Sequence, residues 1–159
     1  MDSRSPKESI TELSTFMQPE HANLQGNVHG GWIMKLVDEA GALAAMRHCR
    51  RPCVTVALDS MTFDAPVLVG DLILLESSVT YVGRTSIESM VTVYAEKILT
   101  GQRTLTNTAF VVYVALDDQR RPTEVTPLLL ESEQEKRRFE QGRARQLERL
   151  ARAHRDKES

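Results

Sequence analysis

The sequence predicts an α+β fold in which one long apolar helix is wrapped by a single antiparallel sheet. The stretch from Trp32 to Met46 is apolar on almost every side, which is typical of a buried helix. Four later stretches alternate apolar and polar residues, as strands with one buried face do. The links between these stretches are too short for the crossover that parallel strands need, so neighbouring strands should be antiparallel.

The expected elements follow from the N-terminus in order. After a polar tail, residues 10–17 predict a first strand, although the alternation there is imperfect. The central helix should begin at Gly30 and Gly31 and end near His48, because Pro52 cannot continue it. Four further strands, which bring the sheet to about five, are expected at residues 53–63, 72–82, 85–99 and 103–116.

Each of the four later strands has an apolar face that we expect to help cover the central helix. The expected faces are Val54, Val56 and Leu58; Ile73, Leu75, Val79 and Tyr81; Ile87, Val91 and Val93; and Phe110, Val112, Val114 and Leu116.

The composition changes after Pro127, where Glu, Arg, Gln and Lys become frequent. Residues 131–157 are good helix formers and predict a long solvated helix. We therefore divide the chain into a domain at residues 1–128 and a charged helical extension at 129–159. This helix either packs weakly on the domain or offers a basic patch to a nucleotide or a partner, and its nearly balanced charges favour weak packing.

Length and charge limit the functions to consider. A chain of 159 residues is long enough for one domain with a substantial core, and its net charge of −2 gives no reason to expect binding to nucleic acid. The sequence contains neither a membrane span nor a secretory signal. Cys49 and Cys53 are too few for a disulfide framework or a zinc site, so we expect free thiols, no metal and a cytoplasmic protein.

Asp38 is the first candidate for chemistry, because a carboxylate inside an apolar helix needs a partner or a function. Its spacing places it on the same helical face as Gly31. It either acts as a general base or nucleophile, or it is a structural carboxylate that pairs with Lys35 or His48. Its neighbour Glu39 is expected to pair with Lys35 at the surface.

The start of the central helix offers further candidates. The N–H of Gly31 could stabilise negative charge on a carbonyl oxygen, although two glycines also suit a tight turn. Asn23, in the preceding loop, could orient a water molecule or a carbonyl group, or it could cap a turn. His29 could line a site or simply cap the helix.

Gly83 to Ser86 form the tip of an expected hairpin with one cation and two hydroxyl groups, Arg84, Thr85 and Ser86. Such a tip suits a phosphate group, and an ordinary exposed turn is an equally good interpretation. The sequence contains no serine nucleophile elbow, phosphate-binding P-loop or dinucleotide fingerprint.

Several of these motifs together resemble the hotdog-fold acyl-CoA thioesterases, particularly the cytosolic brain-type hydrolases and their single-domain bacterial relatives. The resemblance spans nearly the whole chain. It is carried by residues 27–42, 47–49, 96–101, 105–107 and 113–114, and it extends into the charged helix at 135–149.

This resemblance implies a hotdog fold, in which a long helix lies inside a five-stranded antiparallel sheet. It also implies that two such domains pair into one ten-stranded sheet, that three pairs form a hexamer, and that the active sites lie between paired domains. Asn23 and Asp38 match the family's catalytic asparagine and aspartate. In the animal tandem enzymes these two residues belong to unlike halves, whereas here one domain carries both, so a homodimer would hold two equivalent sites.

The activity implied is hydrolysis of fatty acyl-CoA thioesters to fatty acid and coenzyme A, with no metal or redox cofactor. Gly31 would polarise the thioester carbonyl, and Asn23 of the facing protomer would orient the water or the carbonyl. Asp38 would either activate water or attack to form a mixed anhydride. Substrate-binding residues by the same reasoning are His29, Gly30, Arg84, Thr85 and Ser86.

Two other functions stay open at this stage. The first is a hotdog hydratase or dehydratase that acts on acyl thioesters, which would use a histidine such as His29 together with an acid. The second is a non-catalytic acyl-CoA sensor, in which Asp38 would have no chemical role.

Overall fold

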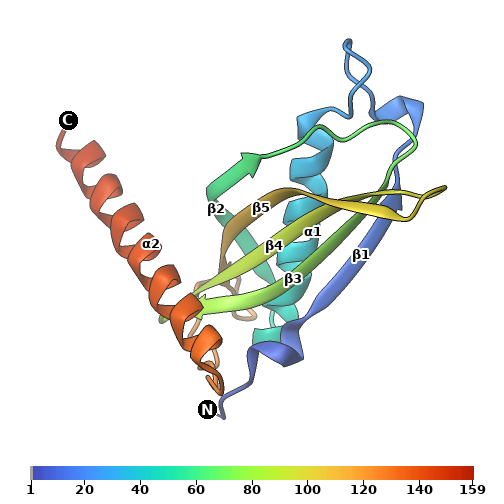
Figure 1. Ribbon diagram of the computed structural model, residues 1–159. Coiled ribbons are helices and arrows are strands. Elements are labelled where there is room, and N and C mark those ends of the chain that lie inside the picture. The colour runs from blue at the N-terminus through green and yellow to red at the C-terminus, as the bar shows by residue number, and fades with distance from the viewer. Residues whose placement is uncertain (1) are drawn as a thin grey trace.

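The computed structural model describes residues 2–159, and it places one long helix against a five-stranded antiparallel sheet (Figure 1). The strand order is β1-β3-β4-β5-β2, so β1 and β2 are the edge strands. This arrangement confirms the predicted α+β hotdog fold. The elements are η1 (Pro6–Ser9), β1 (Thr11–Phe16), η2 (Pro19–His21), α1 (Gly30–Cys49), β2 (Cys53–Phe63), β3 (Leu72–Val82), β4 (Ser86–Lys97), β5 (Gln102–Ala115) and α2 (Glu133–Glu158).

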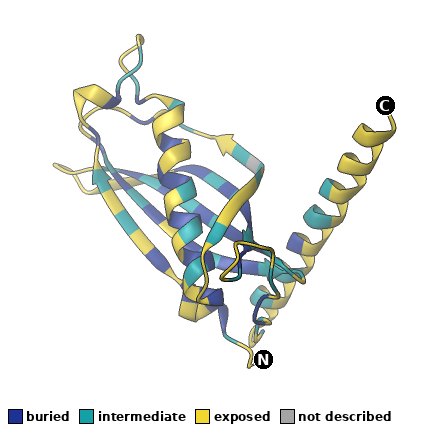
Figure 2. Cartoon of the chain, turned by 180° about the vertical axis from the view of Figure 1, so that it is seen from behind, coloured by how far each residue is buried: buried dark blue, intermediate teal, exposed yellow. Residues whose placement is uncertain are grey.

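Helix α1 starts and ends where the sequence predicts. His29 caps its first turn, and Arg50 ends it in the left-handed conformation with φ of 58°. The expectation that α1 is buried on all sides is wrong, because Trp32, Met34 and Leu43 are 37%, 45% and 38% exposed. The face of α1 that turns away from the sheet is partly uncovered, as Figure 2 shows.

The inner face of the sheet lies close against α1. Two buried hydroxyl groups donate to carbonyl oxygens of the helix, Ser77 Oγ to Ala40 at 2.7 Å and Ser89 Oγ to Gly41 at 2.8 Å. Apolar side chains of β3, β4 and β5 complete the core around these contacts. The predicted inward faces of β3 and β4 are confirmed for Ile73, Leu75 and Val79 and for Ile87, Val91 and Val93.

Tyr81 does not lie on the face predicted for it. The register of β3 against β4 shifts between Val79 and Tyr81, so the alternation is broken by a bulge. Tyr81 consequently turns to the outer face of the sheet, where its ring lies 4.9 Å from that of Phe139 on α2.

Strands β5 and β2 also differ from the predicted pattern. In β5 the residues that pack on α1 include Val111 and Tyr113, whereas Phe110 and Val112 lie on the outer face, towards α2. Because β5 is apolar on both faces, the sequence could not distinguish the inner one. The face of the edge strand β2 that was predicted to be buried is exposed: Val54, Val56 and Leu58 are 39%, 53% and 38% exposed.

Helix α2 is held on the outer face by two ion pairs with buried acids. The Arg145 guanidinium donates two 2.8 Å bonds to Glu88 and stacks 3.7 Å from the centre of the Phe110 ring. Arg149 pairs with Asp59 at 2.6 Å. These contacts are stronger than the weak packing we expected. The last turns of α2, after Arg149, stand away from the sheet (Figures 1 and 2). The boundary at residue 128 stays a prediction.

His48, near the end of α1, is completely buried and joins the helix to the segment before α2. Its Nε2 lies 2.7 Å from the Thr126 carbonyl oxygen, so the neutral ring donates there. Within the described residues its Nδ1 has no hydrogen-bond partner. Burial lowers the pKa of His48 below its usual 6.5, although the Thr126 bond opposes this effect.

We expect this histidine to make the protein less stable in mild acid. Below pH 6.5 the unfolded chain binds a proton at His48 that the folded chain does not, so stability falls by at most about 1.4 kcal/mol per pH unit until the lower folded pKa is reached. His48→Gln should therefore cost most stability above pH 7 and less near pH 5.5. Urea denaturation of both proteins at fixed protomer concentration measures this difference, and an equal cost at both pH values would contradict it.

Candidate active site

The side chain of Asp38 sits halfway along α1, where β2 and β5 approach the helix. Its Oδ1 accepts a 2.8 Å hydrogen bond from Thr55 Oγ1 on β2 and a 3.2 Å bond from the Tyr113 hydroxyl on β5. Within the described residues Oδ2 has no partner, so it is the oxygen available to a substrate or a water molecule. Asp38 pairs with neither Lys35 nor His48, which excludes the structural pairing considered from the sequence.

Tyr113 fixes this part of the helix. Its buried hydroxyl shares its one proton between Oδ1 and the backbone carbonyl oxygen of Asp38, which lies 2.9 Å away. Burial, followed by the negative charge of Asp38, raises the pKa of Tyr113, so the hydroxyl keeps its proton and stays a donor. Gly41 makes room for it, because a Cβ at that position would overlap the Tyr113 hydroxyl.

The start of α1 is arranged differently from the prediction. The Gly31 N–H is not free, since it donates to Nδ1 of His29 at 2.9 Å. This bond confirms that His29 caps the helix, and it means that a thioester oxygen at Gly31 would have to replace the His29 ring. Gly30 lines an open pocket of about 280 Å³ beside this turn. Catalysis at Gly31 and substrate binding at His29 and Gly30 stay predictions.

Asn23 lies in the loop that precedes α1, a loop that projects from the end of the molecule (Figure 1). Its Oδ1 caps the loop by accepting bonds from the N–H groups of Gln25 at 2.9 Å and Asn27 at 3.1 Å. Asn23 lines the same pocket as Gly30, whereas Asp38 is absent from that lining. Asp38 lies two turns further along the helix than Gly31, about 10 Å along its axis, so one protomer does not bring Asn23 and Asp38 together.

The hairpin residues Arg84, Thr85 and Ser86 lie at the other end of the sheet. Ser86 pairs with Val114 next to the end of α1, whereas Asn23 and Gly30 lie at the start of that helix. Within one protomer the hairpin therefore does not join Asn23 and Gly30. Binding of coenzyme A phosphates by the hairpin stays a prediction.

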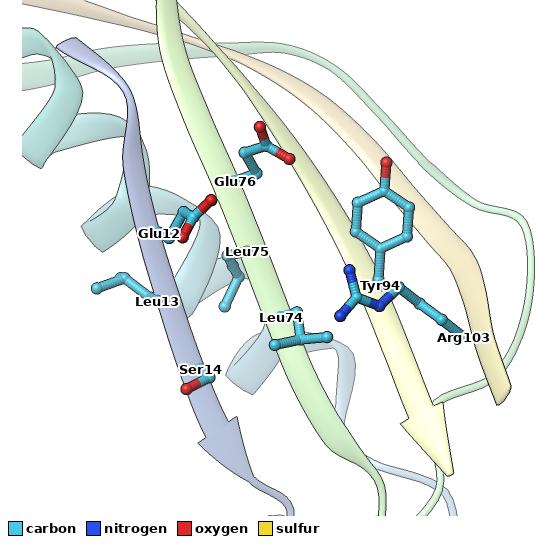
Figure 3. A pocket seen from close by; sticks show the side chains of 8 residues that line it. All are labelled: Glu12, Leu13, Ser14, Leu74, Leu75, Glu76, Tyr94 and Arg103. Carbon is cyan, nitrogen blue, oxygen red and sulfur yellow. The ribbon is translucent and has the colours of Figure 1, made fainter. Parts of the chain in front are cut away.

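Other parts of the surface do not extend this site. A hollow of about 370 Å³ lies on the sheet face opposite α1 (Figure 3), and Arg103 beside it is paired with Glu96 at 3.4 Å. The described residues include no cluster of three or more His, Cys, Asp and Glu side chains that could hold a metal ion. Between residues 2 and 159, no helical stretch has the length and hydrophobicity that a bilayer crossing requires.

Thr55 and Tyr113 complete the surroundings of Asp38, and the sequence reasoning missed both as site residues. In the sequence, Tyr113 belongs only to one of the motifs that carry the resemblance, and Thr55 only to an expected strand. Hydroxyl residues are common in strands, so nothing in the sequence set these two apart. The faces expected for these two strands from the sequence place Thr55 and Tyr113 on the outer side, so their position beside Asp38 appears only in the structure.

A long helix inside a five-stranded sheet, with a hydrogen-bonded carboxylate on that helix beside an exposed edge strand, defines the class of hotdog-fold thioesterases. The Thioesterase superfamily profile matches residues 25–102. A Bacillus subtilis protein described as an uncharacterised acyl-CoA thioester hydrolase is 37% identical over 134 residues, which cover 84% of this chain and 78% of that protein. The chain therefore belongs to the acyl-CoA thioester hydrolase family.

The mammalian relatives are longer. The mouse cytosolic acyl coenzyme A thioester hydrolase is 36% identical over 147 residues, and the match covers 87% of this chain but 39% of the mouse protein. Among solved structures, an apo-hexameric acyl-CoA thioesterase superposes with a TM-score of 0.90 at 37% identity, covering 96% of this chain and 98% of its own.

A Staphylococcus aureus acyl-CoA hydrolase, solved with butyryl coenzyme A, coenzyme A and coenzyme A disulfide, has a TM-score of 0.89 at 28% identity. The match covers 98% of this chain and 95% of that one. Three further structures of that enzyme carry alanine in place of an asparagine, an aspartate or a threonine. The spacing of those three residues along that chain equals the spacing of Asn23, Asp38 and Thr55 here.

Proposed function

We propose that this protein hydrolyses acyl-CoA thioesters to a free fatty acid and coenzyme A, with Asp38 as the catalytic carboxylate. The observation that carries the proposal is the geometry of Asp38, whose Oδ1 is fixed by Thr55 and Tyr113 while Oδ2 is free for the reaction. Family membership supports the substrate class, since relatives in bacteria and mammals are named acyl-CoA thioester hydrolases.

In the proposed reaction Asp38 takes a proton from a water molecule as that water attacks the thioester carbonyl, or it attacks the carbonyl itself. Either route uses the lone pairs of one carboxylate oxygen, and the two hydroxyl donors hold the other oxygen in place. A backbone N–H at the start of a helix would stabilise the charge that develops on the carbonyl oxygen. Gly31 can supply it once the His29 ring moves away. The reaction as proposed needs only water and groups of the chain.

A second protomer is proposed to complete the site with its own Asn23. Asn23 and Asp38 lie apart within one chain, and the loop of Asn23 projects outward, with Leu24 at its tip fully exposed. The uncovered face of α1 and the exposed side chains of β2 form an apolar surface next to Asp38, as an unpaired edge strand and a subunit interface would. A homodimer would bury this surface, and assembly into a hexamer is proposed from the hexameric relatives.

The coenzyme A part of the substrate would extend from this site over the interface, where Arg84, Thr85 and Ser86 are the proposed phosphate contacts. The proposed location is the cytoplasm, because the mammalian relatives are named cytosolic enzymes.

The test is an assay of coenzyme A release from a series running from acetyl-CoA to palmitoyl-CoA. We expect release that saturates with substrate for at least part of the series. Crotonyl-CoA is the substrate that tests the hydratase alternative. Water addition to its double bond without thiol release would identify a hydratase, and binding without turnover across the series would identify a sensor.

A further inference from the structure

The two cysteines of the chain face each other at the junction of α1 and β2. Cys49 is the last residue of α1 and Cys53 is the first residue of β2, and their Sγ atoms are 3.4 Å apart. Both thiols also lie within 3.6 Å of the Arg51 carbonyl oxygen, in the short turn that joins the two elements. Cys53 is partly exposed and Cys49 is 8% exposed, so a molecule as small as a hydroperoxide can approach the pair.

We propose that Cys49 and Cys53 form a reversible disulfide on exposure to a hydroperoxide, and that this bond switches the site around Asp38 to a less active state. A disulfide needs sulfur atoms about 2.05 Å apart, so the two sulfurs must approach by roughly 1.4 Å in total. The turn between them holds only three residues, which keeps the thiols together. The effect on activity rests on the proposed function, whereas formation of the disulfide does not.

The chemistry balances with hydrogen peroxide as the two-electron oxidant, and an organic hydroperoxide would release an alcohol in place of one water. The thiolate of Cys49 attacks one peroxide oxygen, the O–O bond breaks, and hydroxide leaves a sulfenic acid behind. The Cys53 thiol then attacks the sulfenic sulfur, the S–S bond forms, and the oxygen departs as water with the thiol proton. The hydroxide takes up the proton first lost by Cys49, so two thiols and one peroxide give one disulfide and two waters.

Cys49 is suited to the first step. The hydrogen bond with Cys53, helped by the Arg51 backbone, lowers the pKa of Cys49 to about 7 against the opposing effect of burial. The thiolate is the reactive form of cysteine, so a substantial fraction of the pair is reactive near neutral pH. The same hydrogen bond raises the pKa of Cys53, so Cys53 keeps its proton. Cys53 is therefore the resolving thiol, which attacks in the second step.

The disulfide would act on Asp38 through strand β2. Cys53 and Thr55 point to the same side of this strand, because they are two residues apart and precede its first register shift. That side faces α1, where Thr55 donates to Asp38. Cys49 lies three helical turns after Asp38 on the same side of α1. Drawing Cys53 towards Cys49 therefore displaces Thr55 relative to the carboxylate.

The experiment treats the full-length oligomer with hydrogen peroxide and then quenches it. Mass spectrometry of peptides under non-reducing conditions should find Cys49 linked to Cys53 within one chain, with the loss of two hydrogen atoms. Activity should be followed by the loss of thioester absorbance, because a thiol reagent would consume the cysteines. We expect activity to fall between roughly ten- and a hundredfold, as for a displacement of about 1 Å near reacting groups, and dithiothreitol to restore it.

The matched control is Cys53→Ser, which changes one partly exposed atom and leaves Cys49 in its buried place. Cys53→Ser should be as active as the reduced wild type. Peroxide should cause no loss of its activity that dithiothreitol can restore. A second control, Cys49→Ala, removes the thiol that reacts first. The proposed switch is contradicted if the linked peptide forms without loss of activity. It is also contradicted if peroxide inactivates Cys53→Ser reversibly to the same extent as wild type. Absence of the linked peptide would overturn the disulfide itself, whatever the activity of the protein.

Discussion

Asp38→Asn should lower kcat/KM for acyl-CoA hydrolysis by about a thousandfold, within the 10²–10⁴ that a positioned proton acceptor typically contributes. The amide oxygen of asparagine can still accept from Thr55 and Tyr113, whose bonds to Oδ1 are 2.8 and 3.2 Å long. The fold should therefore survive, and the loss should reflect the missing proton acceptor or nucleophile. Steady-state rates with one saturated acyl-CoA, together with a thermal melt of each protein, measure both effects.

Glu39→Gln is the matched control, because it removes a carboxylate from the next position of the same helix. The Glu39 side chain is about half exposed and pairs with Lys35 at 2.6 Å, as the sequence predicted, and such a pair stabilises a helix by a few tenths of a kcal/mol. The hydrolysis rate of Glu39→Gln should stay within about twofold of the wild-type rate, which is the effect expected for loss of a surface charge. Equal rates for wild type and Asp38→Asn would show that Asp38 is not the catalytic group of this hydrolase.

Much of the fold could be predicted because local signals agreed with the tertiary structure. The bounds expected for β2 and β3 match the observed ones, and the end of α1 follows from Pro52. Side-chain direction was harder to predict. A bulge turns Tyr81 outward, and a bulge depends on pairing between strands that no single strand encodes.

The site was also predicted only in part, because one of its residues stands out locally in the sequence and the others do not. Asp38 is conspicuous in sequence, because a carboxylate among apolar helix residues is uncommon. Its partners Thr55 and Tyr113 lie 17 and 75 positions away and meet it only through the packing of β2 and β5 on α1. The bond that occupies the Gly31 N–H is similarly invisible, because it depends on the side-chain conformation of His29.

An equimolar co-expression of Asn23→Asp and Asp38→Asn should recover about one quarter of wild-type activity, although each variant alone is nearly inactive. If every site takes Asp38 from one chain and Asn23 from its partner, random pairing gives intact sites at about this frequency in a two-fold symmetric dimer. Asn23→Asp keeps an Oδ1 acceptor that can cap the loop at Gln25 and Asn27, and it replaces the amide donor by a second, negatively charged carboxylate oxygen. Activity is measured on the whole mixture at a known total protomer concentration, and two affinity tags, one on each variant, verify that mixed oligomers form.

This mixture distinguishes a site formed within one chain from a site shared by two chains, which a single variant cannot do. If Asn23 and Asp38 acted within one chain, every site in the mixture would lack one of them, and the mixed oligomers would be as inactive as their parents. A wild-type chain co-expressed with Asp38→Asn should instead give about half of the full activity in either arrangement, which controls for assembly. Recovery in the first mixture would thus require the projecting Asn23 loop of one protomer to reach the Asp38 carboxylate of another.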